Sequence, residues 1–173
     1  VIVPADAEET RQAIKFAAEF NGPVYIRISR SNLPDIFDSN YKFDYKKANI
    51  IKEGKDVTLI TNGETLVETI DCAKILSEKG IDAEIINVPV VKPLDNETII
   101  NSAKKTNRVI TIENHSIIGG LGSAVCDTLS ANAPTPVLKI GMNDVYGESG
   151  PAKALLEKYE LDAKGIYKKI KAW

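Results

Sequence analysis

The stretch ENHSIIGGLGSAV, residues 113 to 125, follows directly on the strand-like run RVITI, residues 108 to 112. It contains an acid, the only histidine of the chain, a Gly-Gly-x-Gly run and then small apolar residues. A short β-branched run is typical of a buried strand, and glycines before small residues are typical of a helix packed closely on a sheet. The stretch therefore predicts a strand followed by a helix. It also raises the question whether the acid, the histidine and the glycines form a site.

The same alternation of strand-like and helical segments extends from residue 48 to the end of the chain. The runs AEIINV, residues 83 to 88, and PVLKI, residues 136 to 140, predict strands, while Asp95 and Gly80 predict a helix start and a helix end. Helical spacing predicts inward-facing side chains at Leu66, Ile70, Ala73, Leu76, Ile99, Ile100, Ala103, Ile166, Ile170 and Trp173. Strands that alternate with helices predict a mostly parallel sheet that is covered on both faces.

One part of this pattern predicts an antiparallel strand pair. The segment ANIIKEGKDVTLIT, residues 48 to 61, places two apolar runs on either side of Glu53 and Gly54. Apolar runs that flank a short polar turn with a glycine are typical of a hairpin. We therefore expect the chain to reverse at these two residues.

Residues 1 to 30 predict a separate strand–helix–strand unit. Its strands are VIVP at the start and VYIRIS, residues 24 to 29, and its helix follows Asp6 and Glu9, which resemble a capping box. A unit of this size cannot bury both of its faces, so we expect it to belong to a sheet whose other strands lie outside this sequence. The polar and aromatic residues 31 to 45 have no period and predict a linker across the surface.

The composition excludes several classes of partner. Lys and Arg number 22 against 24 Asp and Glu, so the net charge is -2 and no basic field is available for nucleic-acid phosphates. No apolar run approaches the ~20 residues of a membrane span, and no signal peptide is predicted. Cys72 and Cys126 lack metal-ligand spacing and predict no disulfide. We expect a cytoplasmic protein without a nucleic-acid or membrane partner, and the start at Val1 inside an apolar run predicts a trimmed or proteolysed product.

The glycine-rich stretch has a dinucleotide-site alternative, because it lies between a strand and a helix with Asp144 roughly twenty residues further on. Three details oppose this alternative. Six residues, 113 to 118, separate the expected strand from the glycines, where a tight turn is needed. The pattern from Gly120 is Gly-x-Gly-x-x-Val, and Asp144 lies four residues past its strand. We keep the dinucleotide site as the minor alternative.

Other chemistry at this stretch also has weak support. Ser116 is the direct neighbour of His115, and adjacent side chains diverge, so they make a poor nucleophile–base pair. Glu113 and His115 alone are too few ligands for a metal. We favour a structural role, in which Gly119, Gly120 and Gly122 let a helix start close against the sheet. His115 is then either a hydrogen-bonded structural residue or a residue at the rim of a pocket shared with another domain.

The motifs ENHSIIGGLGSAV, IGMNDVYGESGP (140–151) and LLEKYELDAKGIYKKI (155–170) together resemble the C-terminal domain of the transketolase family. That family includes transketolases, deoxyxylulose-phosphate synthases and the beta subunits of 2-oxo acid dehydrogenases. The resemblance covers the whole chain. Residues 46–173 are similar to the C-terminal domain and residues 31–45 to the linker. Residues 1–30 are similar to the end of the domain that binds the pyrimidine of thiamine diphosphate.

The resemblance implies a particular α/β fold. It is a three-layer sandwich around a mostly parallel five-stranded sheet with one antiparallel edge strand, preceded by a β-α-β remnant. The hairpin at Glu53 and Gly54 would supply that edge strand.

The motif ISRSNLP, residues 28 to 34, is similar to a stretch of the transketolases proper. In those enzymes the arginine of the motif contacts the phosphate of the sugar substrate, which implies that Arg30 binds substrate here. A planar guanidinium suits this role because it binds phosphate oxygens with two parallel hydrogen bonds. The alternative is a surface arginine that pairs with Asp35 or Asp38.

The chain departs from the family by what it lacks. The domain that binds the diphosphate and metal is absent, as is most of the pyrimidine domain with its catalytic glutamate. The resemblance therefore implies no catalytic, cofactor-binding or metal-binding residue in this chain. Thiamine diphosphate and a divalent metal, Mg or Ca, would be bound in the whole enzyme and not by this chain.

The resemblance thus implies the C-terminal part of a transketolase-like enzyme, which moves a two-carbon ketol unit between sugar phosphates. The expected partners are a sugar-phosphate substrate, an N-terminal subunit or the missing domains, and a second copy in a homodimer. We expect the chain alone to be inactive. The alternative is an assembly or docking domain of a related thiamine-diphosphate enzyme, either a 2-oxo acid dehydrogenase beta subunit or a deoxyxylulose-phosphate synthase.

Overall fold

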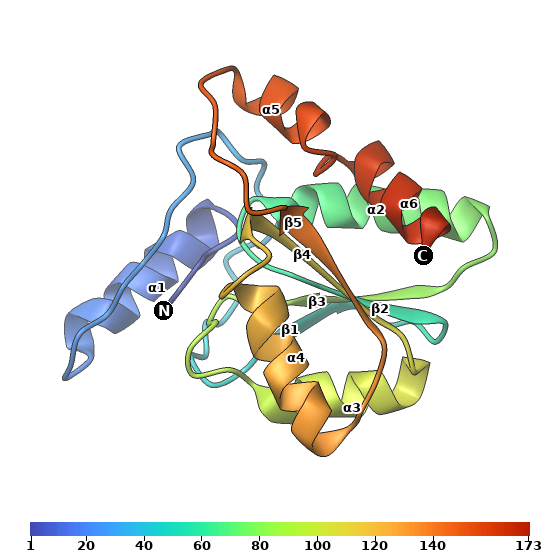
Figure 1. Ribbon diagram of the computed structural model, residues 1–173. Coiled ribbons are helices and arrows are strands. Elements are labelled where there is room, and N and C mark those ends of the chain that lie inside the picture. The colour runs from blue at the N-terminus through green and yellow to red at the C-terminus, as the bar shows by residue number, and fades with distance from the viewer.

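A five-stranded sheet with the strand order β1-β3-β2-β4-β5 forms the middle layer of the computed structural model, which describes residues 1–173 (Figure 1). The strands are β1 (Asn49–Lys52), β2 (Val57–Thr61), β3 (Ala83–Asn87), β4 (Val109–Ser116) and β5 (Val137–Met142). The last four strands run parallel to one another, and β1 pairs antiparallel with β3 at one edge. The predicted α/β fold, a mostly parallel sheet with one antiparallel edge strand, is therefore confirmed.

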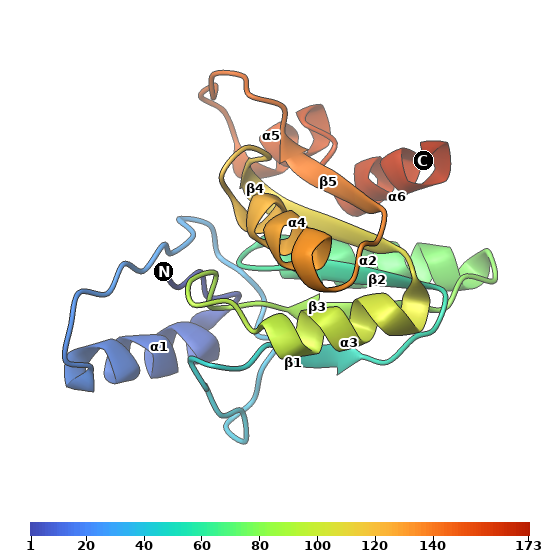
Figure 2. The same cartoon turned by 60° about the horizontal axis from the view of Figure 1, so that its bottom comes forward.

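Helices cover both faces of this sheet (Figures 1 and 2). On one face lie α2 (Thr65–Glu78) and α6 (Ala163–Ala172), and on the other lie α3 (Asn96–Thr106) and α4 (Leu121–Asn132). The short helix α5 (Ala152–Lys158) follows β5, and α1 (Ala7–Glu19) lies apart from the sheet beside the N-terminus. The pair α2 and α6, the sheet, and the pair α3 and α4 therefore form the three expected layers.

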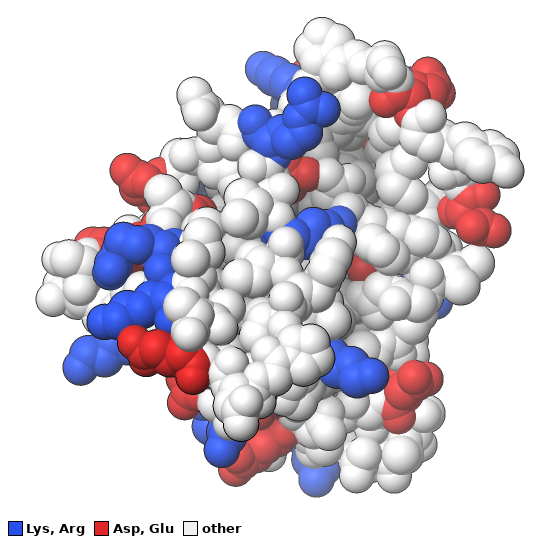
Figure 3. All heavy atoms as spheres, turned by 90° about the vertical axis from the view of Figure 1, so that its left-hand side faces the viewer, with Lys and Arg blue, Asp and Glu red and all other residues white.

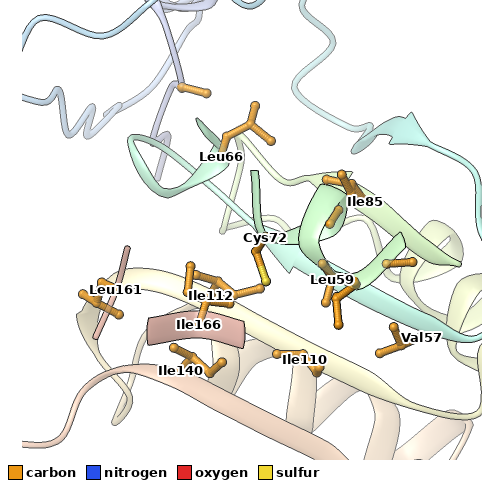
Figure 4. Close-up of a cluster of buried hydrophobic side chains, with 14 residues drawn as sticks. Val57, Leu59, Leu66, Cys72, Ile85, Ile110, Ile112, Ile140, Leu161 and Ile166 are labelled. Atoms are coloured by element: carbon orange, nitrogen blue, oxygen red, sulfur yellow. The ribbon is translucent and has the colours of Figure 1, made fainter. Parts of the chain in front are cut away.

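The strands divide their side chains between two apolar cores. Along β2, Leu59 enters the core beneath α2 and α6, and its neighbour Ile60 enters the core beneath α3 and α4. This alternation follows from the two-residue period of a strand. Figure 4 shows the first core, in which Cys72 of α2 and Ile166 of α6 meet Ile112 of β4. All three of these side chains are fully buried, so both helices are fixed to the sheet.

The predicted hairpin at Glu53 and Gly54 is wrong, although β1 is the antiparallel edge strand. The strand β3 lies between β1 and β2, so the two arms of the expected hairpin are not neighbours. A Cβ atom on Gly54 would lie 2.3 Å from the carbonyl carbon of Ala83, so the chain crosses the start of β3 at this glycine. Every residue of β3 is buried, whereas β1 is half-exposed. An interior position therefore suits β3, and an edge position suits β1.

The two predicted strands of residues 1 to 30 are reduced to isolated bridges. Ile2 bridges to Ile26 in parallel and to Val90 in antiparallel orientation. The N–H of Ile2 donates to Tyr25, and the N–H of Arg27 donates to Ile2, but no longer ladder forms. The segment 24–28 bridges only to the segment around Ile2, and this single partner is too little to continue a regular strand pairing.

The helix of this unit is confirmed, with a change at its start. Asp6 caps α1 by accepting a hydrogen bond from the backbone N–H of Glu9 at 2.8 Å. The carboxylate of Glu9 accepts from the N–H of Ala5 and not from that of Asp6, so the reciprocal bond of a capping box is shifted by one residue. Residues 31–45 contain no helix or strand, and Phe43 and Tyr45 pack on Phe16 of α1.

Two further expectations differ in detail from the structure. The strand β4 continues to Ser116, because Ser116 still pairs with Met142 of β5, so residues 113–116 belong to the strand and not to a spacer. Trp173 does not face inward. It is 39% exposed and lies beside the guanidinium of Arg108, whose central carbon is 4.6 Å from the ring centre.

Candidate functional site

The glycine-rich start of α4 holds a carboxylate of its own chain. The backbone N–H of Leu121 donates to Oε2 of Glu113 at 2.7 Å, and that of Gly122 donates to Oε1 at 2.8 Å. The side chain of Glu113 is only 2% exposed. A carboxylate is stabilised at a helix N-terminus by the free N–H groups and by the positive end of the helix dipole. Glu113 therefore fills the position in which an anionic ligand could bind.

The glycines permit this arrangement by their lack of a side chain. A Cβ atom on Gly120 would lie 2.0 Å from Oε2 of Glu113, and one on Gly122 would lie 2.7 Å from Oγ1 of Thr111. At both residues the helix lies too close to β4 for any side chain, as the structural role predicted for the glycines requires. A dinucleotide diphosphate would have to displace a buried carboxylate here, and Asp144 is exposed on the loop after β5. The geometry does not favour the dinucleotide alternative.

His115 lies in the last residues of β4, at the carboxyl end of the sheet. Its side chain is 49% exposed, and its Nδ1 atom lies 3.9 Å from Oε2 of Glu113 and 3.0 Å from the carbonyl oxygen of Ser116. Sequence spacing alone predicts no acid that orients this histidine. The two-residue period of β4 in fact puts Glu113 and His115 on the same side of the strand. The carboxylate is already engaged with two backbone N–H groups, so its contact with His115 is secondary.

A cleft of about 540 Å³ opens at the junction between the N-terminal unit and the carboxyl end of the sheet. Its walls are residues 27–31, the start of α2, the ends of β4 and β5, and α5 with its flanking loops. Arg30 lines this cleft, and so do Asn114 and Ser116, whereas His115 between them does not. The carboxyl ends of parallel strands are where α/β folds usually place ligands.

The face of the molecule that carries α1 and the N-terminus has few charged groups in its middle. Figure 3 shows the face that carries α1 and the N-terminus, and uncharged atoms cover most of its middle, while charged groups gather mainly toward its margins. Large apolar side chains are exposed in the segments around the cleft, namely Tyr25, Ile28, Ile118, Val145 and Tyr146. Of these, Ile28 and Val145 line the cleft, and the other three lie within two positions of a lining residue. Exposed apolar side chains that gather at one site are typical of a surface that contacts another protein segment.

Four polar side chains join residues 27–31 to the sheet inside this cleft. The Ser29 hydroxyl donates to Oε2 of Glu64 at 2.6 Å, and the side-chain amide of Asn114 donates to Oε1 of the same carboxylate. The Nη1 atom of Arg27 donates to the backbone oxygen of Asn114 at 2.7 Å. Sequence reasoning did not identify these residues. Glu64 follows β2, and Asn114 lies near the end of the neighbouring parallel strand β4. The carboxyl ends of parallel strands meet at one edge of a sheet, so the positions of these two residues could have indicated that they lie close together.

Arg30 has no ionic partner in the structure. No ion pair joins it to Asp35 or Asp38, and the carboxylate of Asp38 instead accepts from the backbone and side chain of Asn40. The alternative of a structural surface pair is therefore not observed. Arg30 is an exposed residue in the lining of the cleft, and no hydrogen bond or ion pair engages its guanidinium.

Neither a group of potential metal ligands nor a helix that could span a membrane is found in this chain. The chain contains no group of three or more His, Cys, Asp or Glu side chains arranged to bind a metal ion. None of its helices combines the length and the apolar composition that crossing a bilayer requires.

Comparison with known proteins gives a consistent result. A family model described as "Transketolase, C-terminal domain" matches residues 46–166. The chain is 41% identical over 173 residues to a putative transketolase C-terminal section of Methanocaldococcus jannaschii, covering 98% of this chain and 54% of that protein. It is 42% identical over 166 residues to the 6-deoxy-6-sulfo-D-fructose transketolase subunit SqwH of a Clostridium species, covering 96% of this chain and 52% of that protein. The chain thus spans about half the length of these relatives.

A solved structure gives the same match in three dimensions. It is described as "Split gene transketolase, inactive beta4 tetramer" and superposes with a TM-score of 0.94 at 46% sequence identity. The match covers 99% of this chain and 56% of that one. The similarity therefore includes residues 1–45 as well as the sheet domain.

Proposed function

This chain belongs to the transketolase family, and from that premise we propose that it is the C-terminal part of a transketolase-like enzyme. The whole enzyme would transfer a two-carbon ketol unit between sugar phosphates. The relatives named as a C-terminal section and as a subunit support a two-part enzyme. The observation that carries the proposal is that Arg30, from the SRSNLP motif, lines the junction cleft without an ionic partner.

The proposed role of Arg30 is to bind the terminal anionic group of the sugar. A guanidinium donates two parallel hydrogen bonds to such a group, and each charge-assisted contact contributes about 1.5–3 kcal/mol. One relative is named for 6-deoxy-6-sulfo-D-fructose, a sugar that ends in a sulfonate. A planar donor fork suits phosphate and sulfonate oxygens alike, so the proposal covers sugars that end in either group.

We place thiamine diphosphate and a divalent metal, Mg or Ca, in the part of the enzyme that precedes this chain. Two observations support this placement: Glu113 already occupies the glycine-rich helix start, and no group of three or more His, Cys, Asp or Glu side chains is arranged to hold a metal ion. Thiamine diphosphate supplies the carbanion chemistry of ketol transfer when it is bound. This chain would contribute substrate binding and structural support, and no catalytic residue.

We further propose the division of the chain into three parts. Residues 1–30 would be the end of the pyrimidine-binding domain, residues 31–45 a linker and residues 46–173 the C-terminal domain. The isolated bridges of Ile2 support this division, since they leave the segment 24–28 with one edge unpaired. We expect an N-terminal subunit or domain to cover that edge, the assembled enzyme to be a homodimer, and the site of action to be the cytoplasm.

The alternative is a docking domain of a related thiamine-diphosphate enzyme, such as a 2-oxo acid dehydrogenase beta subunit. Such a chain would bind an acyltransferase core and would need no substrate arginine. The exposed apolar side chains around the cleft fit either function. The unpaired Arg30 favours ketol transfer, and capture of an acyltransferase core by this chain would favour docking.

The direct experiment is reconstitution. The purified chain, the preceding half of the enzyme, and their mixture are assayed with xylulose 5-phosphate, ribose 5-phosphate, thiamine diphosphate and Mg²⁺. We expect turnover from the mixture and none from either half alone. Turnover by this chain alone, or a stable complex of both halves with no turnover, would contradict the proposal.

A further inference from the structure

The Ser29 hydroxyl fixes the backbone on both sides of Arg30. Its oxygen accepts a hydrogen bond from the backbone N–H of Ser31 at 3.1 Å, which closes a tight turn around Arg30. The same hydroxyl donates its proton to Oε2 of Glu64 at 2.6 Å. The turn that presents Arg30 is therefore attached to a carboxylate of the sheet domain, 35 positions away in sequence.

Glu64 is positioned to hold this turn and does not cap its own helix. It stands at the N-cap of α2, where a carboxylate commonly accepts from the first free N–H groups of the helix. No such bond forms. Its two oxygens instead accept from Ser29 and from the side-chain amide of Asn114. The carboxylate therefore makes no bond to its own helix and instead joins the sheet domain to the N-terminal unit.

A second set of contacts fixes the same junction around Glu64. Arg27 donates from Nη1 to the backbone oxygen of Asn114 at 2.7 Å, so residues 27–31 are linked to the end of β4 by a second hydrogen bond. The neighbouring Gly63 adopts φ of +57° and donates its N–H to the oxygen of Val3 at 3.2 Å. The sheet edge and the N-terminal unit are therefore held together at several points, and the Glu64–Ser29 bond is the one that acts on the turn of Arg30.

From this geometry we propose that Glu64 is a positioning residue that sets the direction of Arg30 through Ser29, with Asn114 fixing the carboxylate. The sheet domain would then contribute to substrate selection by fixing the anion-binding arginine. The inference rests on the proposed function. Misplacement of a binding group by about 1 Å can reduce a rate up to ~10²-fold, so a small change of the turn is measurable.

The test uses the reconstituted enzyme with single and paired substitutions in this chain. Glu64→Ala and Ser29→Ala should each raise KM for a phosphorylated acceptor by roughly three- to tenfold and leave KM for glycolaldehyde within about twofold. Glu64→Gln should recover most of the affinity, because the amide oxygen still accepts from Ser29 and the Asn114 amide, once turned over, accepts from the new NH2 group. In an Arg30→Ala background, Glu64→Ala should have no further effect on KM, since coupled residues give non-additive changes.

A matched control separates positioning from stability. Glu68 lies one turn further along α2 and accepts a hydrogen bond from the backbone N–H of Ala163 at 2.8 Å, and neither residue lines the cleft. Glu68→Ala should lower the melting temperature without changing the ratio of the two KM values. Melting curves of every variant show whether the fold is kept.

The outcomes distinguish this inference from the proposed function. If Arg30→Ala weakens only phosphorylated acceptors but Glu64→Ala weakens both kinds equally, adds to Arg30→Ala, or has no effect, the positioning role is wrong and the proposed function stands. If the wild-type reconstituted enzyme transfers no ketol unit, both are wrong.

Discussion

The Oε2 atom of Glu113 lies 2.7 Å from the backbone nitrogen of Leu121, so the first turn of α4 binds a carboxylate from the strand that precedes it. This relationship gives the glycine-rich stretch a structural role. The glycines allow the helix to approach β4 closely, and Glu113 satisfies two N–H groups that would otherwise be buried without partners.

The first prediction concerns this cap. Glu113→Ala should lower the free energy of unfolding by about 2–4 kcal/mol, because two buried N–H groups lose their acceptor. Glu113→Gln should have a smaller effect, since one oxygen remains. Urea denaturation of the purified chain measures both changes, with Glu157→Ala on the exposed face of α5 as the control. A loss below about 0.5 kcal/mol for the alanine variant would mean that the cap is dispensable.

The second prediction concerns pH. Burial raises the pKa of Glu9, against the hydrogen bonds that Tyr41, Ala5 and Asn87 donate to its carboxylate. A carboxyl group whose pKa is higher in the folded chain stabilises the fold below its unfolded pKa of about 4.3 and loses this contribution as the pH rises through the folded value.

The difference in melting temperature between wild type and Glu9→Gln should therefore change across this pH window, with the wild type losing relative stability as the pH rises. Glu19→Gln at the exposed end of α1 is the control, because Glu19 has no comparable burial. A difference that is constant with pH would refute the raised pKa.

The third prediction concerns the unpaired edge of the N-terminal unit. The N–H of Arg27 donates to Ile2 at 2.9 Å, whereas the N–H groups of Ile26 and Ile28 have no backbone acceptor. Amide exchange followed by NMR should therefore be slower at Arg27 than at its two neighbours, and slower still along β4. Addition of the preceding half of the enzyme should protect Ile26 and Ile28. Strong protection of both in a proven monomer would contradict the unpaired edge.

The periodicity of the sequence was sufficient to predict the layers of the fold, because fully buried parallel strands and amphipathic helices have distinct patterns. It was insufficient for the order of the strands. The turn residues Glu53 and Gly54 resemble a hairpin locally, and only the packing of β3 between β1 and β2 reveals the close crossing at Ala83. The end of β4 was missed for a similar reason, since its polar last residues are strand only by their pairing with β5.

The residues of the candidate site also differ in whether the sequence could predict them. Arg30 lies in a contiguous motif and could be selected by resemblance from the sequence. Glu64 and Asn114 are separated by 50 positions and come together only through the parallel pairing of β2 with β4. No local pattern around either residue indicates the contact with Ser29, because it depends on how the N-terminal unit docks on the sheet.

The fourth prediction concerns His115. Its ring is half-exposed, lies outside the cleft lining and contacts a carboxylate that already caps α4. His115→Ala in the reconstituted enzyme should reduce kcat by far less than the ~10²-fold that follows removal of a general base. Steady-state kinetics with xylulose 5-phosphate checks this. A larger decrease in kcat with an unchanged melting temperature would assign His115 to the chemistry.

The central claim, that this chain supplies the anion-binding arginine of a ketol-transferring enzyme, is tested most directly by acceptor kinetics of Arg30 variants. In the reconstituted enzyme, Arg30→Ala should raise KM for phosphorylated acceptors by roughly ten- to hundredfold, as the loss of a bidentate charged contact requires, and should spare glycolaldehyde. Arg30→Lys should recover part of the loss, because a point charge cannot reproduce the two-pronged contact. An equal effect of Arg30→Ala on phosphorylated and non-phosphorylated acceptors would contradict the account.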